Sequence, residues 1–158
     1  MNPVNDKDVR KDRLELVITR VLDAPAMLVY KVWTEPEHMV RWMGPKGFTA
    51  PSAKLDVREG GRYRALIRSP EGKDYWFHGV YREVVENKRL VFTFAWEEDG
   101  ERGLENLITV TFAEENGKTR MVFKQAPFQS VEERDGHEGG WSEAFDKLAA
   151  YVVTAKEE

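Results

Sequence analysis

The chain has 158 residues, no cysteine and a formal net charge of −4 at pH 7. This length fits one domain with its own core, and the lack of cysteine excludes disulfides, thiolate zinc sites and cysteine nucleophiles. The acidic balance argues against a dedicated nucleic-acid binder. No apolar run approaches the roughly eighteen residues of a membrane span, so we expect a cytoplasmic protein that binds neither nucleic acid nor membrane.

The amino-terminal segment 1–13 is rich in charged residues and lacks the apolar run of a signal peptide. We interpret it as a disordered tail and treat 14–158 as one domain. Segment 14–22 is rich in Leu, Val and Ile and predicts a first strand. Pro25 then indicates a helix start, and two short helices follow, the second ending at Gly44-Pro45.

The next part of the chain has the pattern of strands separated by turn signals, among which Asn116-Gly117 is typical of a two-residue hairpin turn. We place strands near residues 50–57, 62–68, 74–84, 89–97, 104–113 and 118–126. From Trp141 to Val152, apolar residues recur at helical spacing and predict a long C-terminal helix. A lone helix must bury that apolar stripe. We therefore expect an α+β fold in which a curved antiparallel sheet wraps around this helix and leaves a hollow.

Alternation within the strands indicates which side chains face the helix. The residues expected to face inward are Tyr63, Ala65, Ile67, Ile108, Val110, Phe112, Met121, Phe123 and Gln125. The arginines that alternate with the first three, Arg62, Arg64 and Arg68, are interpreted as a solvated outer face. Strand 74–84 is bulky on both faces, so alternation does not orient it, and we place Trp76 and His78 inward.

Eight short motifs occur in an order and at spacings that resemble one protein family. They are Asp23-Ala24-Pro25, Trp33-Thr34-Glu35-Pro36-Glu37, Trp42-Met43-Gly44-Pro45, Gly60-Gly61-Arg62-Tyr63, Gly79-Val80-Tyr81-Arg82-Glu83-Val84, Arg89-Leu90-Val91-Phe92-Thr93-Phe94, Lys118-Thr119-Arg120-Met121 and His137-Glu138-Gly139-Gly140-Trp141. From about residue 14 to 153, the chain is similar to bacterial proteins related to the C-terminal domain of the activator of the ninety-kilodalton heat-shock-protein ATPase.

This resemblance implies the helix-grip fold of the START and birch-pollen-allergen superfamily, in which a curved sheet and a long C-terminal helix enclose a hydrophobic cavity. The implied fold agrees with the element order read from the residues. Gln125 departs from the family, because many relatives have a His at the end of the last strand. A role that depends on that imidazole, such as proton transfer, is therefore not expected here.

The three histidines form no catalytic or metal-binding pattern. His38, on a short surface helix, suits a solvated or stacking role better than catalysis. His78 lies among aromatic residues and suits either a hydrogen-bonded core position or a functional one, and His137 is expected to shape the helix or to meet the sheet. Position 141 is Trp, so the zinc-protease pattern that would begin at His137 is absent. Phosphate loops and hydrolase elbows are absent too, and neither a cofactor nor a metal is indicated.

Aromatic residues make up 11% of the chain, and Trp and Tyr rings both line apolar pockets and point donors at ligands. We therefore expect a protein that binds a small hydrophobic or aromatic molecule between the sheet and the C-terminal helix. Simple core packing is the alternative for each ring. The expected lining residues are Trp42, Phe48, Tyr63, Trp76, His78, Phe94, Trp96, Gln125, Phe128, Trp141 and Phe145. Among them, His78 and Gln125 are expected to orient the ligand.

Two other functions remain open. The family's name suggests a co-chaperone-like regulator of a heat-shock ATPase, and the superfamily also contains enzymes of the cyclase or hydrolase type. In such an enzyme, His78 or a buried acid would act on the bound molecule. No catalytic residue is assigned, and a binding protein is favoured over an enzyme. The bulky strands between residues 75 and 96 suggest a homodimer if they leave an apolar outer patch.

Overall fold

The computed structural model describes residues 14–98, 101–102 and 105–156. In chain order the elements are β1 (Leu16–Leu22), α2 (Ala26–Thr34), α3 (Pro36–Met39), β2 (Thr49–Leu55), β3 (Arg62–Arg68), β4 (Asp74–Val85), β5 (Arg89–Glu98), β6 (Glu101–Arg102), β7 (Asn106–Glu115), β8 (Lys118–Ala126) and α4 (Val131–Lys156). The expected order of elements is confirmed except for the additional short β6, and the predicted strands agree with the observed ones to within two residues at each end. The second short helix ends at Met39, before the expected end at Gly44-Pro45. The expected tail, residues 1–13, lies outside the described residues.

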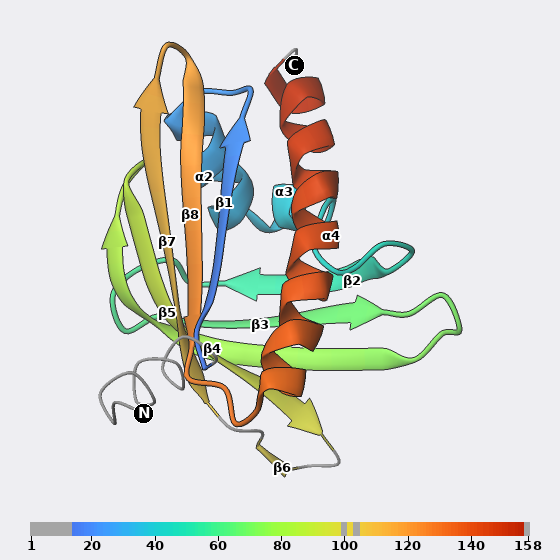
Figure 1. Cartoon of the computed structure of the whole chain (residues 1–158). Coiled ribbons are helices and arrows are strands. Elements are labelled where there is room, and N and C mark those ends of the chain that lie inside the picture. Colours follow the sequence, from blue (N-terminus) through green and yellow to red (C-terminus); the bar gives the residue numbers. More distant parts are fainter. Residues whose placement is uncertain (1–13, 99–100, 103–104, 157–158) are drawn as a thin grey trace, which may run out of the picture.

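The strands pair antiparallel in the order β1-β8-β7-β5-β4-β3-β2, and the short β6 pairs with β5. Figure 1 shows that β1, β7 and β8 run along α4, whereas β2, β3 and β4 cross behind it. The sheet therefore curls through a large angle around the C-terminal helix. This arrangement confirms the helix-grip architecture that the sequence predicts.

Two features help the sheet to bend where β4 lies between β3 and β5. Arg82 is an extra residue in β4, because Tyr81 lies opposite Phe92 while Glu83 lies opposite Val91, and such a bulge bends its strand. Tyr63 lies opposite Gly79 and donates a hydrogen bond across it to the carbonyl oxygen of Thr93, at 2.6 Å. A Cβ on Gly79 would lie 1.9 Å from that oxygen, so only glycine fits here.

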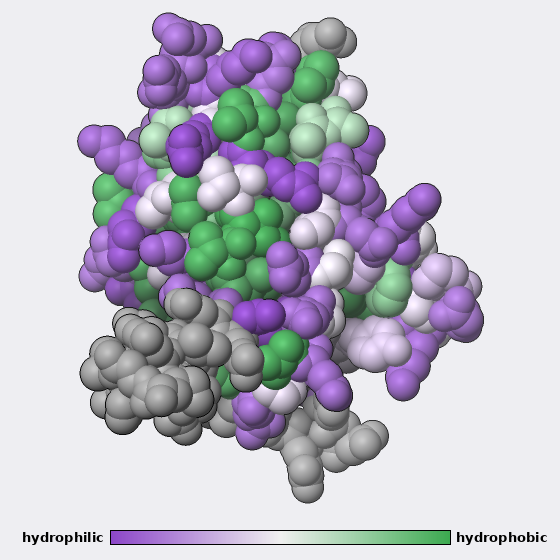
Figure 2. All heavy atoms as spheres, in the orientation of Figure 1, coloured by the Kyte–Doolittle hydropathy of each residue, from purple (hydrophilic) through white to green (hydrophobic). Residues whose placement is uncertain are grey.

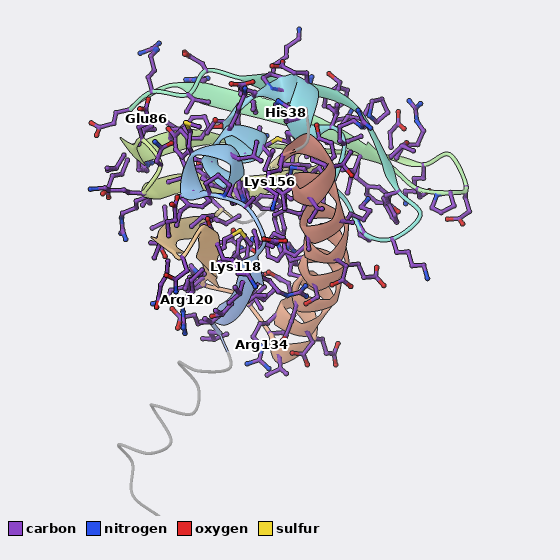
Figure 3. All side chains as sticks on the ribbon, turned by 90° about the horizontal axis from the view of Figure 1, so that it is seen from above. His38, Glu86, Lys118, Arg120, Arg134 and Lys156 are labelled. Atoms are coloured by element: carbon purple, nitrogen blue, oxygen red, sulfur yellow. The ribbon has the colours of Figure 1, made fainter. Side chains whose placement is uncertain are left out.

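The core is built around Trp33 on α2. Its ring centroid lies 4.8 Å from that of Trp42, and 6.1 Å and 6.3 Å from those of Phe145 and Trp141 on α4. The indole nitrogen of Trp33 donates to the sulfur of Met121, and that of Trp42 donates to the carbonyl of Val32 at 3.0 Å. The short helices α2 and α3 thus pack between α4 and the sheet, as the view from above in Figure 3 also shows.

Helix α4 begins at Val131, not at Trp141 as the apolar spacing suggested. Its buried residues, Trp141, Ala144, Phe145, Leu148 and Val152, all belong to the predicted segment. The preceding ten residues are helical without a single buried side chain, and they include Gly136, Gly139 and Gly140. A glycine inside a helix costs about 1 kcal/mol relative to Ala, which is why the pattern placed the helix start after the glycines.

No helix within the described ranges has both the length and the apolar character needed to cross a membrane.

Candidate functional site

A pocket of about 130 Å³ lies between the first half of α4, the loop after α3, and strands β3 to β5. Figure 1 shows α4 crossing in front of β3 and β4 in this region. The lining residues are Met43, Gly44, Pro45, Ile67, Phe77, Phe94, Trp96, Gly136, His137, Gly140, Trp141 and Ala144. Apart from His137 and the indole nitrogens, their side chains are entirely apolar. The pocket is therefore suited to an uncharged guest.

The helical wall of the pocket is made of small residues. Gly136, Gly140 and Ala144 recur every four residues and so lie along one face of α4. A Cβ on Gly136 would meet no atom within 4 Å, and one on Gly140 would lie 3.5 Å from Pro45 Cγ. Because these positions carry little or no side chain, the space beside the helix stays open.

The opposite wall is a set of aromatic rings held in edge-to-face and stacked contacts. The centroids of Phe94 and Trp96 are 5.2 Å apart with planes at 88°, and Phe94 also lies 5.2 Å from Phe77 and 6.2 Å from Trp141. Such arrangements are the preferred geometry of aromatic pairs. The rings therefore support one another, and they form a defined surface against which a flat guest can pack.

The third wall is the loop from Met43 to Phe48, which side chains of α4 hold in place. The ammonium group of Lys147 donates to the carbonyl oxygens of Met43, Pro45 and Phe48, at 3.4, 3.2 and 3.3 Å. The carboxylate of Glu143 accepts a hydrogen bond from the backbone N–H of Lys46 at 3.1 Å. Burial lowers the pKa of Lys147, against the opposing effect of Glu143.

His137 is the one titratable side chain among the described lining residues. The indole nitrogen of Trp96 donates to its Nε2 at 3.2 Å, and burial lowers the pKa of His137 to about 4. The imidazole is therefore neutral at pH 7, with its proton on Nδ1. It meets the sheet as expected, through Trp96, and its ring also packs on Phe128 with centroids 5.0 Å apart.

Among the described residues, the pocket wall offers no carboxylate to pair with this imidazole. In the part of the chain that the structure describes, no group of three or more His, Asp or Glu side chains is placed to hold a metal ion. The chemistry available in the pocket is therefore apolar contact, ring stacking and the single polar edge of His137.

Gln125 is fully buried beside the pocket, and its polar atoms are already used. Its Nε2 donates to Asn106 Oδ1, and its Oε1 accepts from the indole nitrogen of Trp141, both at 2.9 Å. The side chain therefore fixes the orientation of Trp141, one of the pocket walls. It reaches a guest through that ring and not by a hydrogen bond of its own.

The structure brings three of the residues expected from the sequence to the pocket: Phe94, Trp96 and Trp141. Phe48 and Phe128 pack nearby, Phe48 on Tyr75 and Phe128 on His137. Tyr63 lines a smaller void of about 20 Å³, which shares Met43, Phe77, Phe94 and Trp141 with the pocket. Trp42 and Phe145 are fully buried in the core.

The inward orientation expected for Trp76 and His78 was wrong. Strand β4 turns Phe77, Gly79 and Tyr81 inward instead. The physical reason is the contact across Gly79, which requires the glycine to lie beneath the inward-facing ring of Tyr63. Trp76 and His78 consequently lie on the outer face of the sheet.

Several lining residues were not anticipated, among them Met43, Phe77, Gly136 and Ala144. A signal for the helical wall was present in the sequence, since Gly136, Gly140 and Ala144 have helical spacing. It was missed because the helix was expected to begin only after Gly140.

Residues 23–153 match the family model described as Activator of Hsp90 ATPase homolog 1-like protein. Among solved structures, a protein from Chromobacterium violaceum is 27% identical with a TM-score of 0.80, over 87% of this chain and 96% of that chain. The AHSA1 protein from Silicibacter pomeroyi is 24% identical with a TM-score of 0.81, over 89% of this chain and 99% of that chain. No curated protein is significantly similar to the chain.

Proposed function

The chain belongs to the Activator of Hsp90 ATPase homolog 1-like protein family, and on that premise we propose that it binds a small, uncharged molecule with an apolar ring. The supporting observation is the aromatic-lined pocket of about 130 Å³ beneath α4. In another protein, an engineered apolar cavity of about 150 Å³ stays dry and binds benzene. The pocket therefore has room for about one six-membered ring.

The absence of a charged partner among the described lining residues favours a neutral guest. An ionised group moved from water into this pocket would lose its hydration without a counter-charge to replace it. Among the described lining residues, the indole N–H groups of Trp96 and Trp141 already donate to other side chains. The Nδ1–H of His137 is therefore the side-chain donor that remains for a guest with one hydrogen-bonding group. Phenol-like or indole-like rings satisfy these conditions.

The size of the pocket limits the affinity. Burying about 200 Å² of apolar ring surface stabilises a complex by about 5 kcal/mol, which corresponds to a dissociation constant of about 0.2 mM. A larger ligand would gain more only by extending beyond the pocket and contacting surfaces outside it.

Of the two alternative functions, an enzyme is less well supported by this geometry. His137 is neutral and already accepts a hydrogen bond from Trp96, and no carboxylate lines the pocket among the described residues. The co-chaperone alternative draws support from the name of the family alone. A heat-shock ATPase assay with the purified chain tests it directly, and stimulation of the ATPase would favour that alternative.

Titration with toluene, followed by NMR of the tryptophan indole N–H signals, tests the proposed binding. Trp96 and Trp141 line the pocket, whereas Trp76 lies on the outer face of the sheet. We expect the signals of Trp96 and Trp141 to shift on titration and that of Trp76 to stay in place. Equal shifts of all three signals, or none, would contradict the proposal.

A matched pair of helix variants sharpens this test. Ala144→Leu adds three carbon atoms inside the pocket, while Ala150→Leu adds the same atoms on an exposed position of α4. We expect the first variant to lose toluene binding by about tenfold or more, because the added side chain occupies the space of the ring. The second should bind as the wild type does. Thermal unfolding of both variants verifies that each is folded.

A further inference from the structure

A second hollow, of about 560 Å³, lies on the other side of the sheet, on the outer face of β2 to β5. We call it the outer hollow. Four of its lining residues are cationic, Lys54, Arg62, Arg64 and Arg82, and two, Glu97 and Glu105, are carboxylates. The charge is thus predominantly positive on a protein whose net charge is −4.

The strand register places like charges side by side. Lys54 on β2 lies directly opposite Arg64 on β3. Like charges on directly opposed positions destabilise a sheet. Arg82 joins them from the bulge in β4. The repulsion between these cations is relieved in part by Glu97, and a bound anion would relieve it further.

The carboxylate of Glu97 is already committed within the outer hollow. Glu97 accepts two hydrogen bonds from the guanidinium of Arg64, at 2.8 and 3.0 Å, and lies 2.8 Å from His78 Nδ1. The pKa of Glu97 lies below its usual value. The main cause is hydrogen bonding from Arg64, and hydrogen bonding from His78 lowers the pKa further. Glu97 is therefore ionised at neutral pH and accepts the Nδ1–H of His78. Arg64 is also stacked 3.8 Å above the ring of Trp76.

Three cationic side chains and one ring nitrogen of the outer hollow remain unpaired among the described residues. In the part of the chain that the structure describes, the side chains of Lys54, Arg62 and Arg82 have no hydrogen-bond or ion-pair partner, and neither does Nε2 of His78. These groups come from β2, β3 and β4, and all of them line the outer hollow.

We propose that the outer hollow binds the phosphate group of a small organic phosphate, with Lys54, Arg62 and Arg82 as its cationic ligands and His78 Nε2 as a further polar contact. Arginine matches phosphate oxygens with pairs of parallel N–H donors, and lysine supplies a point charge. The volume of the hollow lies within the range of small-molecule sites and exceeds what a phosphate group alone would fill. The net negative charge of the chain disfavours a long nucleic acid as the occupant.

Isothermal titration calorimetry with inorganic pyrophosphate, at constant ionic strength, tests this site. The double variant Arg62→Gln/Arg82→Gln removes two of the cations, and Arg120→Gln is the control. Arg120 is an exposed arginine on β8, which β7 and β5 separate from β4, and Figure 3 shows it away from β2 and β3. We expect the double variant to bind pyrophosphate at least about tenfold more weakly than the wild type, and the control to bind normally.

A third variant tests the sign of the effect. Glu97→Gln removes the carboxylate that competes with the anion for Arg64 and His78, so it should bind pyrophosphate more tightly than the wild type. Equal affinities in the wild type, the double variant and the Arg120→Gln control would overturn the proposal, as would weaker binding by Glu97→Gln. Thermal unfolding shows whether the variants are folded.

A phosphate group could also belong to a lipid. Sedimentation with vesicles of phosphatidylcholine and phosphatidylglycerol distinguishes this source from a soluble phosphate. Binding of pyrophosphate without sedimentation supports the small-molecule ligand, whereas sedimentation without pyrophosphate binding overturns it. The outcome is independent of the pocket beneath α4, because none of the varied residues lines that pocket.

Discussion

The hydrogen bond between Trp96 and His137 joins the sheet to α4 beside the pocket. It requires a neutral imidazole, since Nε2 must accept a hydrogen bond from the indole N–H. Burial lowers the pKa of His137 to about 4, whereas in an unfolded chain the imidazole keeps its ordinary pKa of about 6.5. The unfolded state therefore binds a proton more readily than the folded state does, and stability must fall as the pH falls through this range.

We predict that His137 costs the wild type roughly 2 kcal/mol of unfolding free energy between pH 7 and pH 4.5, after a reduction for its partial exposure. Urea unfolding of the wild type and of His137→Gln at both pH values measures this difference. Gln retains an acceptor for Trp96 without titrating, so the variant should lose less stability on acidification. Identical losses in the two proteins would show that His137 does not carry the effect.

Gln125 leads to a second prediction, since its side chain is hydrogen-bonded to both Asn106 and Trp141. Gln125→Leu leaves two buried polar groups without partners, which should lower the unfolding free energy by about 2 to 4 kcal/mol. A neutral His has one donor and one acceptor and offers the same pair of bonds. Gln125→His should therefore lose clearly less stability than Gln125→Leu in urea unfolding. A His at position 125, as in the relatives named in the sequence analysis, would then replace both hydrogen bonds of Gln125.

The orientation of single side chains was the part of the site that the sequence predicted least well. Phe94, Trp96 and Trp141 line the pocket, and their role in binding a ligand stays a prediction. Trp76 and His78 were misplaced because β4 carries large side chains on both faces, so that hydrophobic alternation cannot distinguish them. The deciding contact is long-range: Tyr63 reaches across Gly79 to Thr93. A spacing rule within one strand does not contain that information.

At the scale of elements, α4 divides into two unequal parts. The part from Trp141 onward buries five side chains, while the ten residues before it bury none and include three glycines. Local stability follows buried apolar contact and helix propensity. The first part of α4, which covers the pocket, should therefore open more easily than the second.

Hydrogen-exchange mass spectrometry tests this division. We predict faster amide exchange in residues 132–140 than in residues 142–152. Gly139→Ala should slow exchange in the first part and raise the unfolding free energy by about 1 kcal/mol, since Gly139 is exposed and its added Cβ would meet no atom within 4 Å. Uniform exchange along α4, in the wild type and the variant alike, would contradict the division.

Element order and strand positions were predictable because periodicity and turn residues are local signals. Asn116-Gly117 marks the turn between β7 and β8, and both residues have positive φ, as a tight hairpin turn requires. The start of α4 was not predictable in the same way. Residues 131–140 form a helix against the preference of their glycines, so the fold as a whole, rather than the local sequence, decides their structure.

At the scale of the whole molecule, the surface differs from the one that suggested a homodimer. The outer face of β4 and β5 carries His78 and Glu97 with Arg64 beside them, where a homodimer would need an apolar patch. Figure 2 shows hydrophobic surface gathered over the middle of another face, around β1, where Val17 and Val21 are 47% and 65% exposed. A homodimer stays a prediction, and native mass spectrometry of the full chain is the measurement that checks it.

Phe77 and His78 are consecutive residues of β4, yet one lines the pocket and the other the outer hollow. A guest that shifts the backbone at Phe77 would also shift His78, because the two residues share a peptide bond. Any resulting change in anion affinity is bound by thermodynamic reciprocity: the factor by which toluene alters the dissociation constant of pyrophosphate equals the factor by which pyrophosphate alters that of toluene. Strand β4 would then couple the pocket to the outer hollow. Titrating toluene in the presence of pyrophosphate, and pyrophosphate in the presence of toluene, measures that coupling.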